Sequence, residues 1–175
     1  SLKRLRGTPM HVASYFIGKS LLVLVSMAIQ VVLLLAGGMI FFGVQLPSDP
    51  YKWLTFTWLI ILGSAASTAL GIAFSSVPKS GRGASAVVSP VVIILQFFSG
   101  VFFVFTDLPG WMQQVAAIFP LKWMTQGMRS VFLPDSFALR EVAGTWETER
   151  TFLILMAWLV VGIFLAIRTF KWSRD

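Results

Sequence analysis

The chain has 175 residues, of which 57% are hydrophobic and only 12% are charged, and its formal net charge is +7. Soluble domains usually carry about 25% charged residues, because their surface must be hydrated. Too little polar surface remains here for water, so we expect lipid to be the solvent for much of the chain. The sequence has no cysteine and a single histidine, which excludes disulfides and thiolate or multi-histidine metal sites within it.

The basic charge does not indicate nucleic-acid binding. Nucleic-acid-binding proteins gather lysine and arginine on a polar face with aromatic residues between them. Here these residues occur in short clusters beside apolar runs, as at the cytoplasmic ends of membrane helices. We therefore expect the lipid bilayer as a partner and no nucleic acid.

Four apolar runs predict four membrane-spanning helices in an all-α integral membrane protein. The hydrocarbon core of a bilayer is about 30 Å thick and needs about 20 helical residues. We place the spans at residues 12–43, 53–77, 83–106 and 151–170. A cleaved secretory signal is a poor alternative for the first run, because its charge-free part is longer than the roughly 7–15 residues of a signal core.

The connection between the last two spans, residues 107–150, begins with an apolar part that prolines interrupt. Its charge-free run, residues 108–121, is too short to cross a bilayer and suits a re-entrant or interfacial helix. We predict two short helices, at about residues 109–119 and 121–132, that dip into the outer leaflet and return. The remainder is polar, and its cluster of glutamates predicts a solvated face (Glu141, Glu147 and Glu149).

The distribution of charge predicts the direction of the spans. Nine of the 14 lysines and arginines lie in the two terminal segments and in the connection between the second and third spans, where the only acid is Asp175. The other five share the opposite connections with six acids. Because lysine and arginine are enriched on the cytoplasmic side, we expect both ends of the chain to be cytoplasmic and residues 107–150 to be extracellular or re-entrant.

The predicted spans contain no Asp, Glu or His. Catalysis needs positioned groups that exchange protons or attack, so we predict no catalytic residue and no metal site. Ion-coupled carriers usually keep an ionisable group at membrane depth, which makes an ion-coupled carrier a weaker alternative. We therefore expect the energy for any transport to come from a partner.

Three further patterns each allow two interpretations. An aromatic segment in the third span could line a path for hydrophobic solutes, or its phenylalanines could face lipid or the protein interior (Gln96, Phe97, Phe98, Phe102 and Phe103). Small residues four apart in the second span favour packing within the protein over a subunit interface (Gly63, Ser67 and Gly71). Lys122 and Arg129 share a helix face, which favours anchoring to lipid phosphate over binding an anionic substrate.

The stretch SGVFFVFTDLPGWMQQVAAIFPLKWMTQGMRSVF strongly resembles the signature region of the type-two membrane subunits (permeases) of ATP-binding-cassette (ABC) exporters. It carries a small-Gly-aromatic pattern, a Leu-Pro-Gly-Trp turn and a Phe-Pro-Leu motif (Ser99–Phe103, Asp107–Trp111 and Phe119–Leu121). LKRLRGTPM followed by YFIGK is similar to the cytoplasmic segment that enters the third span of that family. The resemblance extends over essentially the whole chain.

The resemblance implies a six-span domain, of which this chain would hold the third to sixth spans and lack the first two. It also implies a second permease subunit, the same or different, and a cytoplasmic ATP-binding subunit that holds ATP and Mg²⁺, with no cofactor in this chain. Residues 1–11 would end the coupling segment that touches the ATPase (Leu2, Lys3, Arg4, Leu5 and Arg6). The paired short helices would close the exit of the path (Pro109, Gly110, Trp111, Phe119 and Pro120).

Together these observations predict a permease subunit of an ATP-driven exporter in the bacterial inner membrane. Short loops and the aromatic third span favour a hydrophobic or amphiphilic substrate, such as a drug, an antibiotic or a lipid. The alternatives are a non-transporting membrane scaffold or assembly protein and an ion-coupled secondary transporter.

Overall fold

The computed structural model describes residues 12–74 and 81–169, within which all regular structure is helical and no strand occurs. The chain divides into two compact units, residues 1–46 and residues 47–175, and each is described by itself. Three helical segments in the described ranges are long and apolar enough to cross a membrane, and a shorter apolar helix accompanies them (Leu21–Phe42, Pro50–Phe74 and Thr148–Arg168, with Val88–Phe98).

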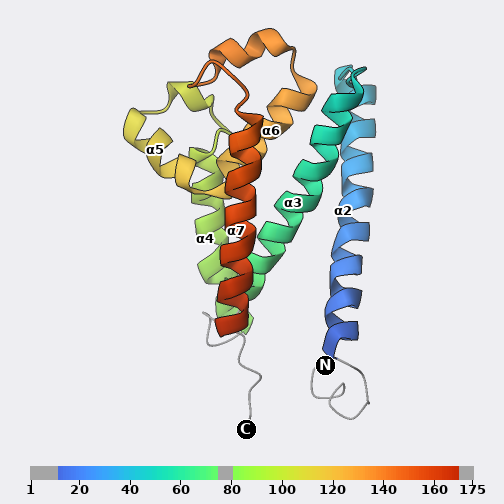
Figure 1. The fold of residues 1–175 in the computed structure, drawn as a ribbon, viewed down its shortest axis with the longest axis vertical. Coiled ribbons are helices and arrows are strands. Elements are labelled where there is room, and N and C mark those ends of the chain that lie inside the picture. Colours follow the sequence, from blue (N-terminus) through green and yellow to red (C-terminus); the bar gives the residue numbers. More distant parts are fainter. Residues whose placement is uncertain (1–11, 75–80, 170–175) are drawn as a thin grey trace. The chain divides into compact units, whose positions relative to one another are not determined.

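The first unit consists mainly of helix α2 (Val12–Phe42), which Figure 1 draws as one uninterrupted helix. Its 31 residues rise about 46 Å at 1.5 Å per residue, which exceeds the thickness of the hydrocarbon core. The helix ends because Gly43 has a φ of +63°, a left-handed conformation that glycine adopts without steric cost. The N–H of Gly43 donates to the carbonyl of Met39, as in an αL motif, and the N–H of Val44 donates to the carbonyl of Gly38.

In the second unit, α3 (Pro50–Phe74) packs along α7 (Thr148–Thr169). The Asp49 carboxylate accepts the N–H of Tyr51 at 2.9 Å and caps the start of α3. The core of the unit includes Leu59 and Leu155, which are fully buried (0% exposed). These apolar contacts hold the two long helices together.

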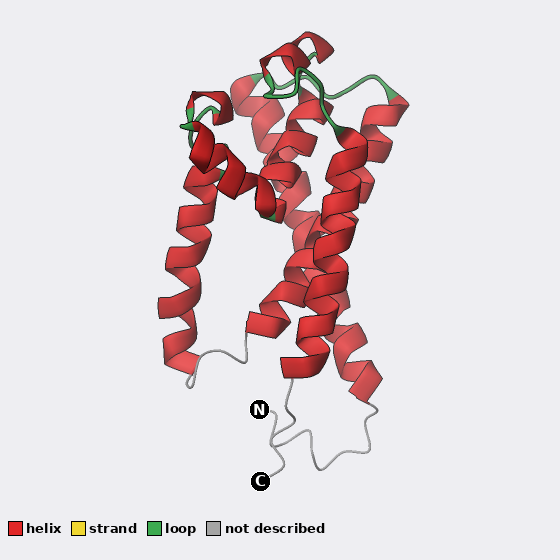
Figure 2. Ribbon diagram, turned by 60° about the vertical axis from the view of Figure 1, so that its left-hand side comes forward, coloured by secondary structure: helices red, strands yellow, loops and turns green. Residues whose placement is uncertain are grey.

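Helix α4 (Gly81–Phe98) ends eight residues before the predicted end of the third span at residue 106. The chain turns there because Gly100 has a φ of +81°, which ends a right-handed helix. A non-helical stretch leads to the short 3-10 helix η1 (Phe105–Asp107). Figure 2 shows α4 standing apart from α3 and α7 over most of its length, and its side chains Ile93 and Ile94 are half exposed.

Two short helices follow, α5 (Gly110–Ile118) and α6 (Pro120–Phe132), which confirms the predicted pair to within two residues at each end. Pro120 occupies the first position of α6, where its missing N–H costs no hydrogen bond. The 3-10 helix η2 (Asp135–Arg140) comes next. Figure 1 shows α6 and η2 at the end of the unit where α7 begins, and α6 packs on both α3 and α7. The membrane depth of these helices stays a prediction.

Candidate functional site

The polar and charged side chains that contact one another lie on α6 and in the segment before α7. Helix α6 buries one face against the rest of the unit, and that face is unusually polar (Lys122, Trp123, Gln126, Gly127, Ser130 and Val131). Figure 1 shows α6 beside the start of α7, and α6 packs on α3, α7, α5 and α4. Because the residues of its polar face are buried, that face is enclosed by protein.

Lys122 is the buried cation of this face, with only 4% of its surface exposed. Its ammonium lies 3.6 Å from the centre of the Trp123 ring and 5.2 Å from that of Phe105. It donates a hydrogen bond to Oε1 of Gln126. No ion pair to a carboxylate occurs among the interactions that the structure describes for Lys122, so aromatic rings and an amide surround this charge.

Burial lowers the pKa of Lys122 from 10.5 to about 8, because the charged form loses its hydration. The carboxylates of Glu147 and Glu141 oppose this shift, whereas the guanidinium groups of Arg129 and Arg150 add to it. Near pH 7 the ammonium form still predominates. The site therefore contains a charge that is held at a cost in free energy.

Two ion pairs surround the lysine. The guanidinium of Arg129 holds Glu141 in a two-point contact, at 2.7 Å from Nε and 3.2 Å from Nη2, and Arg150 contacts Glu147 at 2.9 Å. Gln126 Nε2 donates to the carbonyl of Trp146 at 3.0 Å and lies 3.4 Å from Glu147 Oε2. The polar segment before α7 is thus tied to α6 by hydrogen bonds.

These contacts correct the prediction of a solvated glutamate cluster. The Glu141 side chain is 8% exposed and that of Glu147 is 15% exposed, and of the three glutamates only Glu149 is in the exposed class. The sequence concealed the pairing because Arg129 and Glu141 are 12 residues apart on different elements. The prediction that Arg129 anchors to lipid phosphate is likewise not supported, since its guanidinium is engaged by Glu141.

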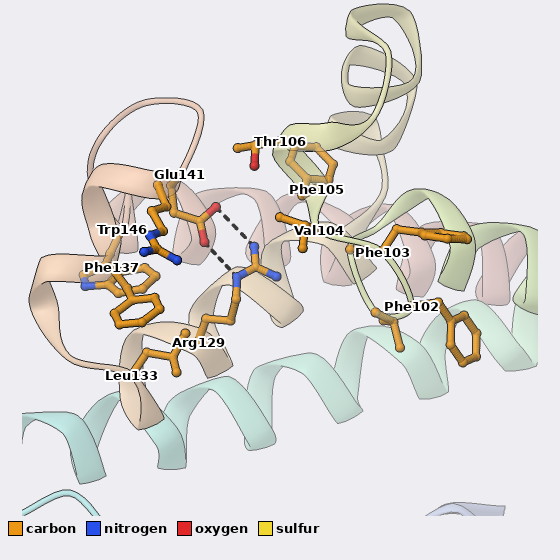
Figure 3. Close-up of a pocket in the computed structure, with 13 residues that line it drawn as sticks. Phe102, Phe103, Val104, Phe105, Thr106, Arg129, Leu133, Phe137, Glu141 and Trp146 are labelled. Atoms are coloured by element: carbon orange, nitrogen blue, oxygen red, sulfur yellow. Dashed lines mark hydrogen bonds and ion pairs between the residues drawn. The ribbon is translucent and has the colours of Figure 1, made fainter.

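Figure 3 shows a cavity beside this pair, of about 360 Å³, whose wall contains the Arg129–Glu141 pair. Phe137 and Trp146 lie beside Glu141, and Phe102 and Phe103 lie at the opposite end. The cavity thus joins an ion pair to aromatic surface.

A second cavity, of about 310 Å³, lies between α5, α6 and the segment before α7, and Phe105 separates the two by lining both. Its polar wall includes Lys122 and Arg150. Both cavities therefore lie at the end of the unit that carries the short helices.

The residues predicted for the substrate path are only partly brought together. Phe97 lies 5.1 Å from Phe102 and 5.7 Å from Phe103 between ring centres, and the latter two line the larger cavity. Phe98 instead contacts Trp111 edge-on at 6.5 Å, and Gln96 lines neither cavity. Their role in a path is not tested by these contacts.

The residues predicted for the exit element occupy the ends of the two short helices. Pro109 precedes α5, and Gly110 and Trp111 open it, with the indole 63% exposed. Phe119 stacks on Trp158 of α7 at 6.2 Å, and Pro120 begins α6. The predicted coupling residues lie outside the described part of the chain (Leu2, Lys3, Arg4, Leu5 and Arg6).

The sequence contains a signal for the buried lysine that the sequence-based predictions did not include as a site. Lys122 and Gln126 are four residues apart and Trp123 is adjacent, which places an ammonium, an amide and an indole on neighbouring helix positions. In the described ranges, no group of three or more His, Asp or Glu could hold a metal ion. The arrangement is suited to binding by charge and aromatic contact.

Comparison with known protein families matches residues 1–168 to the family described as ABC-2 family transporter protein. Neither the curated proteins nor the solved structures gave a match. The family match agrees with the resemblance drawn from the signature motifs and covers nearly the whole chain.

Proposed function

The chain belongs to the ABC-2 family of transporter proteins, and we propose that it forms the translocation path of an ATP-driven exporter for a hydrophobic or amphiphilic substrate. It is a multi-pass integral membrane permease and not an enzyme, since ATPase activity in this family resides in separate ATP-binding subunits. The permease itself carries no cofactor. ABC-2 permeases generally pair with ATP-binding subunits, and we propose such a subunit and a second permease as the partners here.

We propose four spans with both ends of the chain on the cytoplasmic side of a bacterial inner membrane. The basic terminal segments and the basic connection between α3 and α4 support this direction. Helix α4 has 18 residues and rises about 27 Å. After α4 the chain turns at Gly100 and reaches η1 through bends, so α4 alone supplies the helical part of the third of these spans.

The observation that carries the proposal is the structure of the short helices. The 49 residues between α4 and α7 form a folded cap that packs on α3 and α7 through α6, and the Lys52–Asp135 ion pair joins this cap to α3. The aromatic cluster at the end of α4 leads into a cavity beneath this cap. A cap that could shift relative to α4 would open or close this end of a path when the ATPase drives the spans.

The proposed path is tested by transport into vesicles that contain the permease and its ATP-binding partner. ATP-dependent movement of fluorescent amphiphiles is expected, and Phe103→Ala should lower it several-fold because Phe103 lines the cavity. Phe164→Ala is the matched control, since the Phe103 and Phe164 side chains are equally exposed at 54% and Phe164 lines neither cavity. Equal losses in the two variants would contradict the path.

The proposed coupling segment has its own test. Reversing the charges of Lys3, Arg4 and Arg6 should weaken co-purification with the ATP-binding subunit, and unchanged association would place the coupling surface elsewhere. Vesicles without any ATP-dependent movement would favour a scaffold, whereas movement driven by a proton gradient alone would favour a secondary transporter.

A further inference from the structure

We propose that the 310 Å³ cavity between α5, α6 and the segment before α7 binds the anionic headgroup of an amphiphile, with the Lys122 ammonium as its counter-charge. The proposal concerns a binding site and does not depend on the direction or energy source of transport. It rests on the burial of Lys122, on the pairing of its neighbours and on the lining of the cavity.

The positive charge of Lys122 is buried. A buried ammonium is costly unless a carboxylate or other acceptors compensate it, and Lys122 is 4% exposed without an ion pair among the described contacts. The two nearby carboxylates are already engaged, Glu141 by Arg129 and Glu147 by Arg150. Among the contacts that the structure describes, Lys122 is therefore a buried cation without its own anion.

The Lys122 ammonium also has N–H donors that its neighbours in the described part of the chain do not use. A lysine ammonium has three N–H donors, and one of those of Lys122 donates to Oε1 of Gln126. Gln126 cannot rotate away freely, because its Nε2 is held by the carbonyl of Trp146 and by Glu147. The indole of Trp123 covers another side of the ammonium at 3.6 Å. Donors thus remain for an anionic oxygen that enters the cavity.

The wall of the cavity is also suited to an anion. Lys122, Arg150 and Glu147 are its charged residues, so the wall carries a net charge of +1 and suits one negative charge. Gln113 and Gln114 add amide groups on one side. The rest of the lining is apolar or aromatic (Phe105, Gly110, Ala117, Trp123, Val142 and Ala143).

A volume of about 310 Å³ is at the lower end of small-molecule pockets, which span about 300–1,000 Å³. It accommodates a headgroup and the first part of an apolar chain rather than a whole lipid. The shared chemistry is a singly charged oxygen anion, a phosphodiester or a carboxylate, attached to an apolar tail. Such a ligand could be a membrane phospholipid or a free amphiphile, and the experiment separates these sources.

The test measures binding to the purified full chain in a neutral detergent, by ligand-induced thermal stabilisation and by native mass spectrometry. The probes are phosphatidylglycerol for a membrane source, dodecanoate for a free amphiphile, and phosphatidylcholine as the zwitterionic comparison. We expect at least one anionic probe to bind at least ten-fold more tightly than phosphatidylcholine. Which of the two anionic probes binds identifies the source.

Two variants locate the ligand. Lys122→Met removes the charge while keeping an apolar side chain of similar length, and Ala143→Trp fills the cavity while leaving Lys122 in place. Each should weaken anion binding at least ten-fold. Lys52→Met is the matched control, because Lys52 is a part-buried lysine on α3 that lines neither cavity, and its binding should equal that of the unmodified chain.

The proposal is overturned if phosphatidylcholine binds as tightly as both anions, or if neither anion binds. It is also overturned if Ala143→Trp binds the anions with unchanged affinity while a cooperative thermal transition shows that the variant is folded. The Ala143→Trp result stands even if Lys122→Met fails to fold. Loss of binding in Lys52→Met equal to that in Lys122→Met would show a general charge effect and would likewise reject the site.

Discussion

The contact between α3 and α7 and the cap formed by α5, α6 and the segment before α7 are held together by different forces. Along α3 and α7 the contact uses small residues, and a Cβ placed on Gly162 would lie 2.9 Å from Cβ of Ala69 and 3.2 Å from N of Leu70. In the cap, the Arg129–Glu141 pair and the hydrogen bonds of Gln126 make the connections. The α3–α7 contact depends on the close approach of the two helices, and the cap depends on ion pairs and hydrogen bonds.

The two regions differ in the kind of interaction that stabilises them, and this difference follows from their surroundings. Lipid tails are as apolar as leucine, so helices within a bilayer associate through close packing and not through a hydrophobic drive. In the cap the Arg129 side chain stays 24% exposed, so its pair with Glu141 forms without full desolvation. We therefore expect steric substitutions to damage the α3–α7 contact and charge substitutions to damage the cap.

The largest effect is expected for Gly162→Leu. The added side chain would meet the backbone of α3, which cannot move aside, so we expect a loss of about 3 kcal/mol or more in stability. The measurement is the yield of monodisperse protein and its thermal midpoint in detergent. Gly71→Leu is the matched control, because nothing lies within 4 Å of a Cβ at that position. Similar losses in both would mean that α3 and α7 do not pack as described.

The next effect is expected for Arg129→Met, which leaves the nearly buried Glu141 carboxylate without its partner. Breaking a buried pair costs about 3–5 kcal/mol, and because the Arg129 side chain is 24% exposed we expect about 2 kcal/mol. Thermal denaturation checks this value. Replacing both partners, Arg129→Met with Glu141→Leu, should recover most of the loss, and an additive loss would show that the pair is not the cause.

Lys122→Met should instead stabilise the ligand-free chain near pH 7, by about 1 kcal/mol, because it removes a buried charge. The pKa of Lys122 is lowered to about 8 in the folded chain, so the unfolded chain binds more protons between pH 8 and 10.5. The stability of the unmodified chain therefore rises with pH over this window.

The advantage of Lys122→Met should consequently shrink between pH 8 and 10.5. The other charged groups that face the ammonium are present in both proteins (Glu141, Glu147, Arg129 and Arg150). Paired thermal melts across this range measure the difference. A constant difference from pH 7 to 10.5 would contradict a buried, titrating lysine.

The smallest effect is expected for Arg150→Gln. Its ion pair with Glu147 joins residues three apart, and the Arg150 side chain is 67% exposed. Exposed pairs contribute about 0–1 kcal/mol, so the thermal midpoint should change little and the change should shrink further in high salt. A loss as large as that of Arg129→Met would remove the distinction between buried and exposed pairs in the cap.

Particular residues show which structural features could be predicted from the sequence. The short helices were predictable, because Pro109 and Pro120 mark their starts through local backbone restriction. The end of α4 was harder to place, since the apolar run continues past Gly100 and hydropathy does not report a left-handed turn. Of the small residues expected to share a packing face, Gly63 is buried, whereas Ser67 and Gly71 are exposed in this structure.

The sequence by itself determined the helical segments, their apolar character and the family, because these depend on local composition and on motifs read along the chain. Only the tertiary structure decided that Arg129 meets Glu141, that Gly162 lies against α3, and that Lys122 is enclosed beside a cavity. Those outcomes depend on distances between elements far apart in the chain. Hydropathy and periodicity describe one helix at a time and contain no information on which neighbour each face will meet.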